Sequence, residues 1–168
     1  MTTTMPVEPV IAQRTAQPYV AIRRLVTMQT IPEIADRIPD VFGWLGARGV
    51  APAGAPFLKY NVIDMERELE VEAGVPVEEP VAADESVLAG VLPAGRYVTL
   101  THRGHPDQLI DVTAALLAWA EQRGLVWDAV DTEAGQRWGC RLESYHTDPA
   151  EESDMNKWET ELSFRLAD

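Results

Sequence analysis

The heptapeptide Trp44-Leu-Gly-Ala-Arg-Gly-Val50 recurs as Trp119-Ala-Glu-Gln-Arg-Gly-Leu125, with the same Trp-x-x-x-Arg-Gly-apolar spacing. In both copies a helical apolar period precedes the tryptophan, and the glycine suits the position just after a helix end. The motif therefore predicts two matched helix ends. A chain that carries the same helix end twice is best explained as a duplicated structural unit.

Predicted strands surround the two helices in the same order. Alternating apolar residues predict strands at 7–14, 19–26, 57–63, 68–77, 87–92, 96–103, 137–145 and 157–166. Prolines place the strand at 7–14 at a sheet edge. Glutamates give the strand at 68–77 one wet or polar face. The first helix opens with the capping-box pattern Thr30-Ile-Pro-Glu33, and Pro39 predicts a kink or a fresh start. The second has Pro106 at its first position and Gly124 after its end.

The sequence therefore predicts an α+β fold made of two strand-helix-strand-strand modules. The first spans about residues 17–77, the second about residues 96–166, and an acidic connection at 78–85 joins them. Each module is short of apolar core by itself. The two are expected to share one mostly antiparallel sheet, with both helices on one face and a ligand groove on the other. We expect residues 1–168 to form a single domain.

Acidic residues dominate the charge of the chain. The formal net charge is −13, and affinity for nucleic acids depends mostly on Lys and Arg, so direct binding to DNA or RNA is not expected. The acids gather at 64–85, which holds nine acids and one arginine, and at 148–161, which holds six acids and one lysine. We interpret these segments as solvated loops and strand edges rather than as a source of negative electrostatic potential that attracts cationic ligands.

Several other classes of site and location are disfavoured. No apolar run approaches the roughly 18 residues of a membrane helix, and the N-terminus lacks the order of a signal peptide. We therefore expect a cytoplasmic protein without a membrane partner. Cys140 is the only cysteine, which excludes an intrachain disulfide. With no closely spaced His/Cys set and no Gly-rich phosphate loop, neither a metal nor a cofactor is expected.

The strand predicted at 137–145 carries the candidate site. We expect the apolar Cys140 and Leu142 to face the helices. Alternation then turns three neighbours toward the groove: Arg141, Glu143 and Tyr145. The same alternation predicts that four residues of other strands point there: Tyr19, Tyr97, Thr99 and Glu161. The sequence does not fix the face of two further aromatic residues, which we place at the border of the groove: Tyr60 and Trp138.

A carboxylate among aromatic rings suits an organic cation, because the negative charge and the ring faces both attract a weakly hydrated cation. Burial would raise the pKa of Glu143, and a bound cation would lower it. In the alternative interpretation Glu143 has no binding function and is a solvated strand residue that pairs with Arg141 or Arg165.

Three local patterns resemble the GyrI-like (gyrase-inhibitory-protein-like) family of effector-binding domains, which also occur fused to DNA-binding regulators. Thr101-His-Arg-Gly-His-Pro106 stands where the family has His-Arg/Lys-Gly-Pro-Tyr. Glu143-Ser-Tyr-His-Thr-Asp-Pro149 stands where it has Glu-x-Tyr-x-x-Asp-Pro, and Glu70-Val-Glu-Ala-Gly-Val-Pro-Val77 looks like its Val-Gly-Val-Pro strand end. The resemblance covers about residues 5–166, and the order of the motifs makes it more specific than any one of them.

The resemblance implies a pseudo-twofold pair of modules around a central pocket for large, often aromatic and cationic, molecules. The pocket glutamate of the family falls on Glu143. His105-Pro106 departs from the family's Pro-Tyr, so an aromatic contribution is not carried over at that position. No helix-turn-helix segment is recognised, so we expect the stand-alone form, for which a direct role in transcription would need a partner chain or a further domain.

The resulting hypothesis is drug or effector sensing or sequestration, in which a central pocket binds bulky aromatic or cationic molecules with Glu143 at its base. One alternative is an enzyme. It would be a hydrolase that opens strained cyclopropane rings of alkylating natural products, as some stand-alone family members do. Glu143 would activate water, and Tyr145 or Tyr97 would donate a hydrogen bond to the leaving group or the developing oxyanion. A second alternative is an acidic protein-interaction module that binds a basic patch on a partner, which the sequence does not identify.

Overall fold

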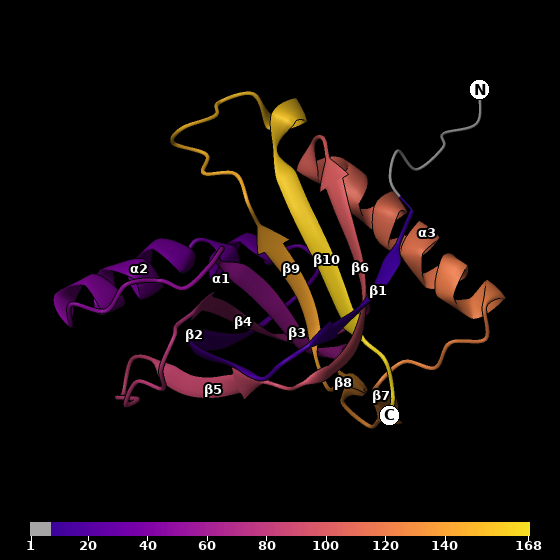
Figure 1. Cartoon of the computed structure of the whole chain (residues 1–168), viewed down its shortest axis with the longest axis horizontal. Helices are drawn as coiled ribbons and strands as arrows, with labels where there is room; N and C mark the ends of the chain where they lie inside the picture. The colour runs from indigo at the N-terminus through magenta and orange to yellow at the C-terminus, as the bar shows by residue number, and fades with distance from the viewer. Residues whose placement is uncertain (1–7) are drawn as a thin grey trace.

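The computed structural model describes residues 8–168, so Val7, the first residue of the first predicted strand, lies outside the described residues. One sheet contains ten strands, eight of them on the path β1-β6-β10-β9-β3-β4-β2-β5 (Figure 1). The strands are β1 Val10–Arg14, β2 Gln17–Val26, β3 Phe57–Ile63, β4 Leu69–Pro76, β5 Leu88–Leu92, β6 Gly95–Arg103, β7 Ala129–Thr132, β8 Gly135–Trp138, β9 Arg141–Tyr145 and β10 Glu159–Arg165. The helical segments are α1 Pro32–Ala35, α2 Ile38–Ala47, α3 Leu109–Gln122 and the short 3-10 turns η1 Pro106–Gln108 and η2 Met155–Lys157.

The element order repeats as predicted. The first module consists of β2, α1 with α2, β3 and β4, and the second of β6, α3, β9 and β10. The two modules join where β9 pairs antiparallel with β3, and the named strand pairs are all antiparallel. β1 lies at one edge, as expected for the first strand, and β5 lies at the other. The predicted α+β class with a mostly antiparallel sheet is confirmed.

Both helical parts pack on the same face of the curled sheet. Val41 and Leu45 of α2 pack with Val20 and Val75 of the first module. Leu116 of α3 packs with strand residues of the second module: Val98, Leu100, Leu162 and Phe164. Directly paired residues point to the same side, and one row of such pairs crosses the sheet: Leu100, Leu162, Glu143, Leu58, Ala73 and Ile22. Figure 1 shows α2 and α3 over opposite ends of the sheet.

The repeated Trp-x-x-x-Arg-Gly motif ends α2 and α3 in the same way. Gly49 and Gly124 both have a φ of 68°, in the left-handed region that favours glycine. In both helices the amide of the residue after the glycine donates to the carbonyl five residues earlier, at 3.0 and 3.1 Å. The guanidinium carbon lies 3.7 Å from the ring centre of the preceding tryptophan for Arg48 and 4.1 Å for Arg123. The predicted helix ends are confirmed.

The first helix differs from its prediction at its start. The Thr30 hydroxyl accepts a hydrogen bond from the Thr27 amide (2.7 Å), and the N-cap of α1 is Ile31, without a side-chain cap. The capping-box prediction is therefore wrong, because the Thr30 side chain closes the preceding turn instead. α1 ends after four residues and α2 starts anew one residue before Pro39, so the predicted interruption is confirmed.

The strand predicted at 137–145 is in fact two strands. β8 ends at Trp138 and β9 begins at Arg141, and β8 forms a hairpin with β7 that the alternation does not predict. At the break, the Gly139 amide donates to the Asp128 carbonyl (2.8 Å), and a Cβ at this position would overlap the Asp128 side chain. The close approach of another chain segment therefore interrupts the strand.

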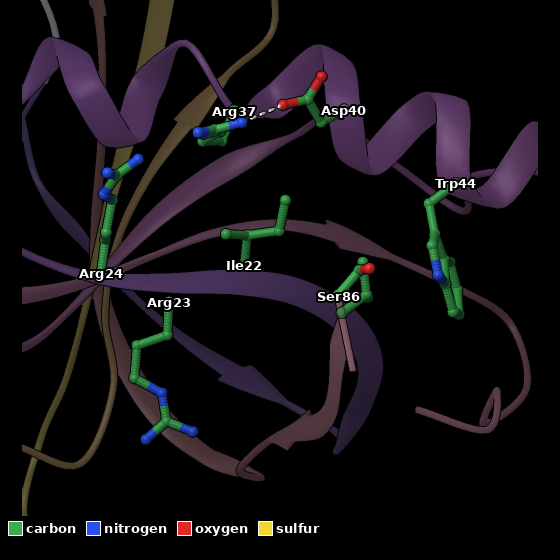
Figure 2. Close-up of a pocket in the computed structure, with 8 residues that line it drawn as sticks. Ile22, Arg23, Arg24, Arg37, Asp40, Trp44 and Ser86 are labelled. Carbon is green, nitrogen blue, oxygen red and sulfur yellow. Dashed lines mark hydrogen bonds and ion pairs between the residues drawn. The ribbon is translucent and has the colours of Figure 1, made fainter. Parts of the chain in front are cut away.

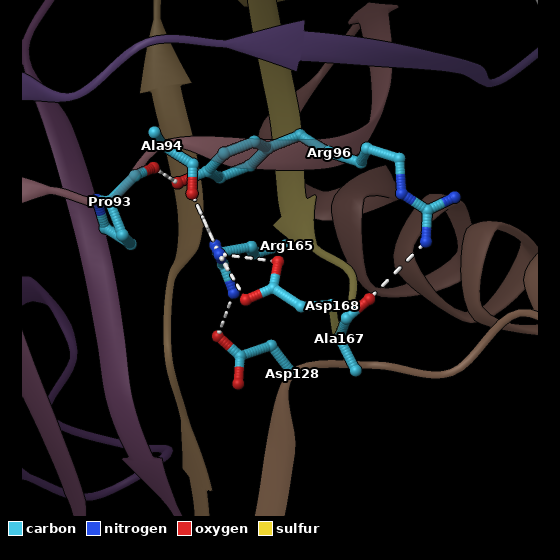
Figure 3. A network of polar contacts seen from close by, with 8 residues as sticks. Pro93, Ala94, Arg96, Asp128, Arg165, Ala167 and Asp168 are labelled. Atoms are coloured by element: carbon cyan, nitrogen blue, oxygen red, sulfur yellow. Dashed lines mark hydrogen bonds and ion pairs between the residues drawn. The ribbon is translucent and has the colours of Figure 1, made fainter.

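Arg165 of β10 holds three chain segments together at one end of the sheet (Figure 3). Its guanidinium donates to the Ala94 carbonyl at 2.8 and 3.1 Å, to Asp128 at 2.8 Å and to Asp168 at 3.1 Å. Only 11% of the Arg165 side chain is exposed, compared with 87% of the Asp168 side chain. The Asp128 contact is partly buried, whereas the Asp168 side chain is exposed, so we expect the Asp128 contact to stabilise the fold more than the Asp168 contact does.

Arg165→Met keeps much of the aliphatic length but removes the donors. We expect the free energy of unfolding to fall by about 2 kcal/mol, because the Ala94 carbonyl and Asp128 lose a shielded partner. Asp168→Asn is the matched control and is expected to cost less than about 0.5 kcal/mol, because Asp168 is exposed. Urea denaturation followed by tryptophan fluorescence measures both variants, and equal losses would contradict this assignment.

Candidate functional site

β9 lies near the middle of the sheet and carries Glu143 on the helix-bearing face. Glu143 is directly opposite Leu162 of β10 and Leu58 of β3. Both leucines belong to apolar clusters that also contain helix residues, so Glu143 points to the side that the helices cover. The main helix contacts are those of α1 and α2 with β2 and β4, and of α3 with β6. Figure 1 shows β9, the strand that carries Glu143, between α1 and α2 on one side and α3 on the other.

The face predicted for β9 is wrong. Cys140 and Leu142 lie on the helix-free face, in a buried cluster with Tyr19, Phe57 and Tyr97. The prediction assumed that apolar residues mark the helix-bearing face. The sheet is curled, however, and its helix-free face also encloses an apolar cluster. Apolar character therefore does not distinguish the two faces of this strand.

Glu143 is half-buried and accepts one hydrogen bond. The Tyr145 hydroxyl donates to Glu143 Oε1 (2.6 Å). The other oxygen, Oε2, has no hydrogen-bond partner among residues 8–168 and is not fully buried. Burial raises the pKa of Glu143, whereas the Tyr145 hydrogen bond and the positive charge of Arg141 lower it. Glu143 is thus a poorly hydrated carboxylate with one oxygen open to a partner.

Tyr60 and Tyr145 are half-buried on the same face. Both pack against an apolar cluster that includes Ile34 of α1 and Leu58 of β3. Burial raises the pKa of each tyrosine, and the negative charge of Glu143 raises both further, so the hydroxyls stay protonated at neutral pH. The Tyr60 hydroxyl has no hydrogen-bond partner in the described part of the chain and is not enclosed. Tyr60, whose face the sequence does not fix, therefore lies on the side of Glu143.

Arg141 occupies an aromatic cluster on this face. Its guanidinium carbon lies 4.8 Å from the Trp138 ring centre and 4.4 Å from that of Phe164. Trp127 completes the cluster, with ring-centre distances of 5.5 Å to Trp138 and 5.8 Å to Phe164. Burial lowers the pKa of Arg141 to about 10, so the side chain remains charged at neutral pH. Trp138 is 4% exposed, so it packs against Arg141 and is closed to an incoming molecule.

The other predicted residues lie on the helix-free face. Tyr97 and Glu161 line a cavity of about 480 Å³ there. Glu161 forms ion pairs with Arg14 (3.3 Å) and, when the imidazole is protonated, with His146 (3.2 Å). Apolar side chains also line this cavity: Phe57, Leu92 and Leu142. The sheet therefore separates Tyr97 and Glu161 from Glu143, and the prediction that one groove holds all three is wrong.

Tyr19 belongs to a buried polar network that the sequence analysis missed. Its hydroxyl donates to Glu72 Oε1 (2.6 Å), and Asn61 donates to Glu72 Oε2. Lys59 donates to Asn61 and lies 3.8 Å from Glu72. Glu72 is 4% exposed, so the polar face predicted for its strand is buried at this position, whereas Glu70 is half-buried. The available signal was the polar pair Lys59 and Asn61, two residues apart on a strand that precedes the glutamates.

Three further observations concern other classes of site. Cys140 is buried, and burial raises the pKa of its thiol. Among residues 8–168, no group of three or more His, Cys, Asp or Glu side chains is placed to hold a metal ion. In the same part of the chain, no helix is long and apolar enough to cross a membrane.

Comparison with protein families gives one match that spans nearly the whole chain. Residues 7–167 match the model described as the GyrI-like small molecule binding domain. No match is found among curated proteins.

Solved structures with the same fold are distant in sequence. An EcmrR–DNA complex matches with a TM-score of 0.75 and 20% identity over 95% of this chain and 57% of that one, so this chain spans little more than half of EcmrR. SAV2435 bound to tetraphenylphosphonium matches with a TM-score of 0.62 and 14% identity over 96% and 94% of the two chains. A hydrolase encoded by lin2189 from Listeria innocua matches with a TM-score of 0.57 and 13% identity over 95% and 92%. At these identities the likeness shows the fold.

Tyr145→Phe removes a hydrogen bond that stabilises the ionised form of Glu143. We expect the pKa of Glu143 to rise further above its ordinary range. Tyr97→Phe is the matched control, because Tyr97 lies on the other face and should leave that pKa unchanged. Carboxyl ¹³C NMR titration measures it, with the Glu143 signal assigned from its loss in Glu143→Gln. An unchanged or lowered pKa in Tyr145→Phe would show that this hydrogen bond does not form in solution.

Proposed function

The chain belongs to the GyrI-like small molecule binding domain family, and we propose that its ligands are bulky aromatic or cationic molecules bound at Glu143. The observation that carries the proposal is the half-buried carboxylate with one open oxygen. In the cell, such binding would serve to sense or to sequester drugs or effector molecules.

The charge of Glu143 supports a cationic ligand. A carboxylate that has lost much of its water is costly unless a positive charge or hydrogen bonds compensate it. The Arg141 guanidinium is instead directed onto the Trp138 and Phe164 rings. No cationic side chain within residues 8–168 comes within 4.0 Å of the Glu143 carboxylate. A ligand cation would therefore supply the missing partner, and its binding would lower the raised pKa of Glu143.

The neighbouring tyrosines support a ligand with aromatic groups. Tyr60 and Tyr145 offer ring surfaces that attract cations and stack with other rings, and their hydroxyls stay neutral at physiological pH. The open Tyr60 hydroxyl can donate to or accept from a polar group of the ligand. SAV2435, which shares the fold, is bound to tetraphenylphosphonium, a bulky aromatic cation. That observation supports the same ligand chemistry for this chain.

Glu143→Gln is expected to weaken binding of a rhodamine-type cationic dye by about tenfold or more, which corresponds to about 1.4 kcal/mol. The wild-type affinity should fall as the pH drops through the raised pKa of Glu143, because protonation removes the charge that attracts the dye. The fall should therefore occur at higher pH than for an ordinary glutamate, and Glu143→Gln should lack it. Quenching of tryptophan fluorescence measures the affinities.

Glu161→Gln is the matched control, because Glu161 lines the cavity on the opposite face. It should leave dye binding unchanged. If Glu161→Gln loses the dye and Glu143→Gln retains it, the ligand occupies the helix-free face and the proposal for Glu143 is wrong. The absence of dye binding at micromolar concentration would also count against it.

Hydrolysis of strained cyclopropane rings is the second candidate function. The observation in its favour is the raised pKa of Glu143 beside a hydroxyl donor, Tyr145, at 2.6 Å. A carboxylate with a raised pKa is a better general base toward water, and a nearby hydroxyl can stabilise a developing negative charge. The related fold of a hydrolase from Listeria innocua is consistent with this chemistry.

The test is incubation of the protein with a cyclopropane-bearing alkylating natural product and detection of the ring-opened product by mass spectrometry. If the protein is such a hydrolase, wild type should exceed the buffer rate, and Glu143→Gln should lose most of the excess. Tyr145→Phe should lower the rate by about tenfold or more. Dye binding without turnover of the alkylator would leave binding as the function and rule out this substrate class.

A further inference from the structure

A second hollow lies beside α2, away from β9. It has a volume of about 440 Å³ and is lined by Ile22, Arg23, Arg24, Arg37, Asp40, Trp44, Ser86 and Val87 (Figure 2). Three consecutive residues of β2, Ile22 to Arg24, belong to this lining. Successive side chains of a strand point to opposite faces of the sheet. A hollow that touches all three therefore runs along the edge of β2.

This edge of β2 is open because β5 covers only part of it. β2 extends to Val26, but β5 pairs only with Gln17 to Ala21. The chain before β5 turns away from β2 at Ser86 and Val87, whose amides donate to Asp84 Oδ1 at 2.7 and 3.0 Å. Within residues 8–168, no neighbouring strand therefore pairs with the second half of β2 on this side, and its outward backbone groups are left without a strand partner.

Arginines surround the open edge. Arg23 and Arg24 are exposed, and neither forms an ion pair within the described part of the chain. Among residues 8–168, the only ion-pair partner of Arg37 is Asp40, at 3.0 Å. Figure 2 shows Arg24 of β2 and Arg37 at the start of α2 reaching toward the same side of the hollow. The chain has 14 basic residues and a net charge of −13, so three arginines at one strand edge form a distinct local positive field.

We propose that this edge binds an extended acidic peptide segment of another protein, which adds to the sheet as a strand beside β2. The peptide would continue the line of β5, antiparallel to β2, and would bond to the open backbone groups between Ile22 and Val26. Acidic side chains on its helix-bearing face would meet Arg24 and Arg37. The backbone hydrogen bonds to β2 would supply affinity, and the arginines would supply selectivity for acidic side chains.

The open backbone edge favours a peptide over a small anion. A free phosphate or carboxylate would use the arginines but leave the β2 backbone unpaired. Edge strands often carry charged residues that prevent pairing with other chains, which is the alternative explanation of Arg23 and Arg24. That explanation predicts no binding of an acidic strand, so the two are separable. The proposed surface does not involve Glu143 and is independent of the small-molecule site.

The test uses the whole protein and a labelled peptide of alternating glutamate and valine, six residues long, followed by fluorescence anisotropy. A second peptide replaces every valine with proline, which keeps the charge but removes strand pairing. We expect the valine peptide to bind and the proline peptide to bind at least about tenfold more weakly. Hydrogen exchange should slow at the amides of 22–26 only with the valine peptide.

Arg24→Glu should weaken binding by about tenfold or more, because it places a negative charge against the acidic peptide. Arg103→Glu is the matched control: Arg103 is also an exposed strand arginine, but it lies on β6 and should have no effect. If the two peptides bound equally well, binding would depend on charge alone and not on strand pairing, and the proposal would be overturned. No binding at millimolar peptide in low salt would overturn it as well. So would self-association of the protein that Arg24→Glu abolishes, since a second copy would then be the occupant.

Discussion

The pairing of β9 on both of its sides fixes the direction of every side chain at the boundary between the two modules. β10 places Leu162 opposite Glu143, and β3 places Leu58 opposite the same residue. A direct antiparallel pair requires both side chains to leave the sheet on the same side, so the two leucines hold Glu143 on the helix-bearing face. A shift of one residue would put Glu143 into the apolar cluster around Tyr97. The arrangement of Glu143 and its tyrosines depends on this register.

The buried and half-buried charges of the molecule differ in how well they are compensated. Lys59 and Glu72 on the helix-free face are tied together through Asn61 and Tyr19. Such a connected network is typical of a structural role, since each buried polar atom has a partner. Glu143 has a single hydrogen bond and an open oxygen. This incomplete compensation distinguishes it from Glu72 and makes it the better candidate for binding a ligand.

Some of the acidic residues stabilise local turns. Asp64, Asp84, Asp148 and Asp154 each accept hydrogen bonds from backbone amides of the following turn. This pattern agrees with the interpretation as solvated loops for these four residues, but not for the whole of 64–85, because Glu70 and Glu72 lie on the inner strand β4 and Glu72 is buried. It gives no support to a dedicated acidic surface for a basic partner. By contrast, two of the three arginines that line the hollow beside β2, Arg23 and Arg24, have no carboxylate partner within residues 8–168.

The sequence by itself determined the duplicated architecture and the helix ends. Local physics is sufficient for these features, since the apolar period, the left-handed glycine and the Arg-on-Trp contact each involve residues within a few positions of one another. It also identified Glu143, Tyr145 and Tyr60 as candidates, through the motif and the aromatic neighbours. Only the tertiary structure decided on which face of the sheet these three side chains lie. The backbone at Gly139 meets Asp128 and interrupts the strand, and the curled sheet encloses apolar side chains on both faces, so alternation alone could not tell which side of β9 faces the helices.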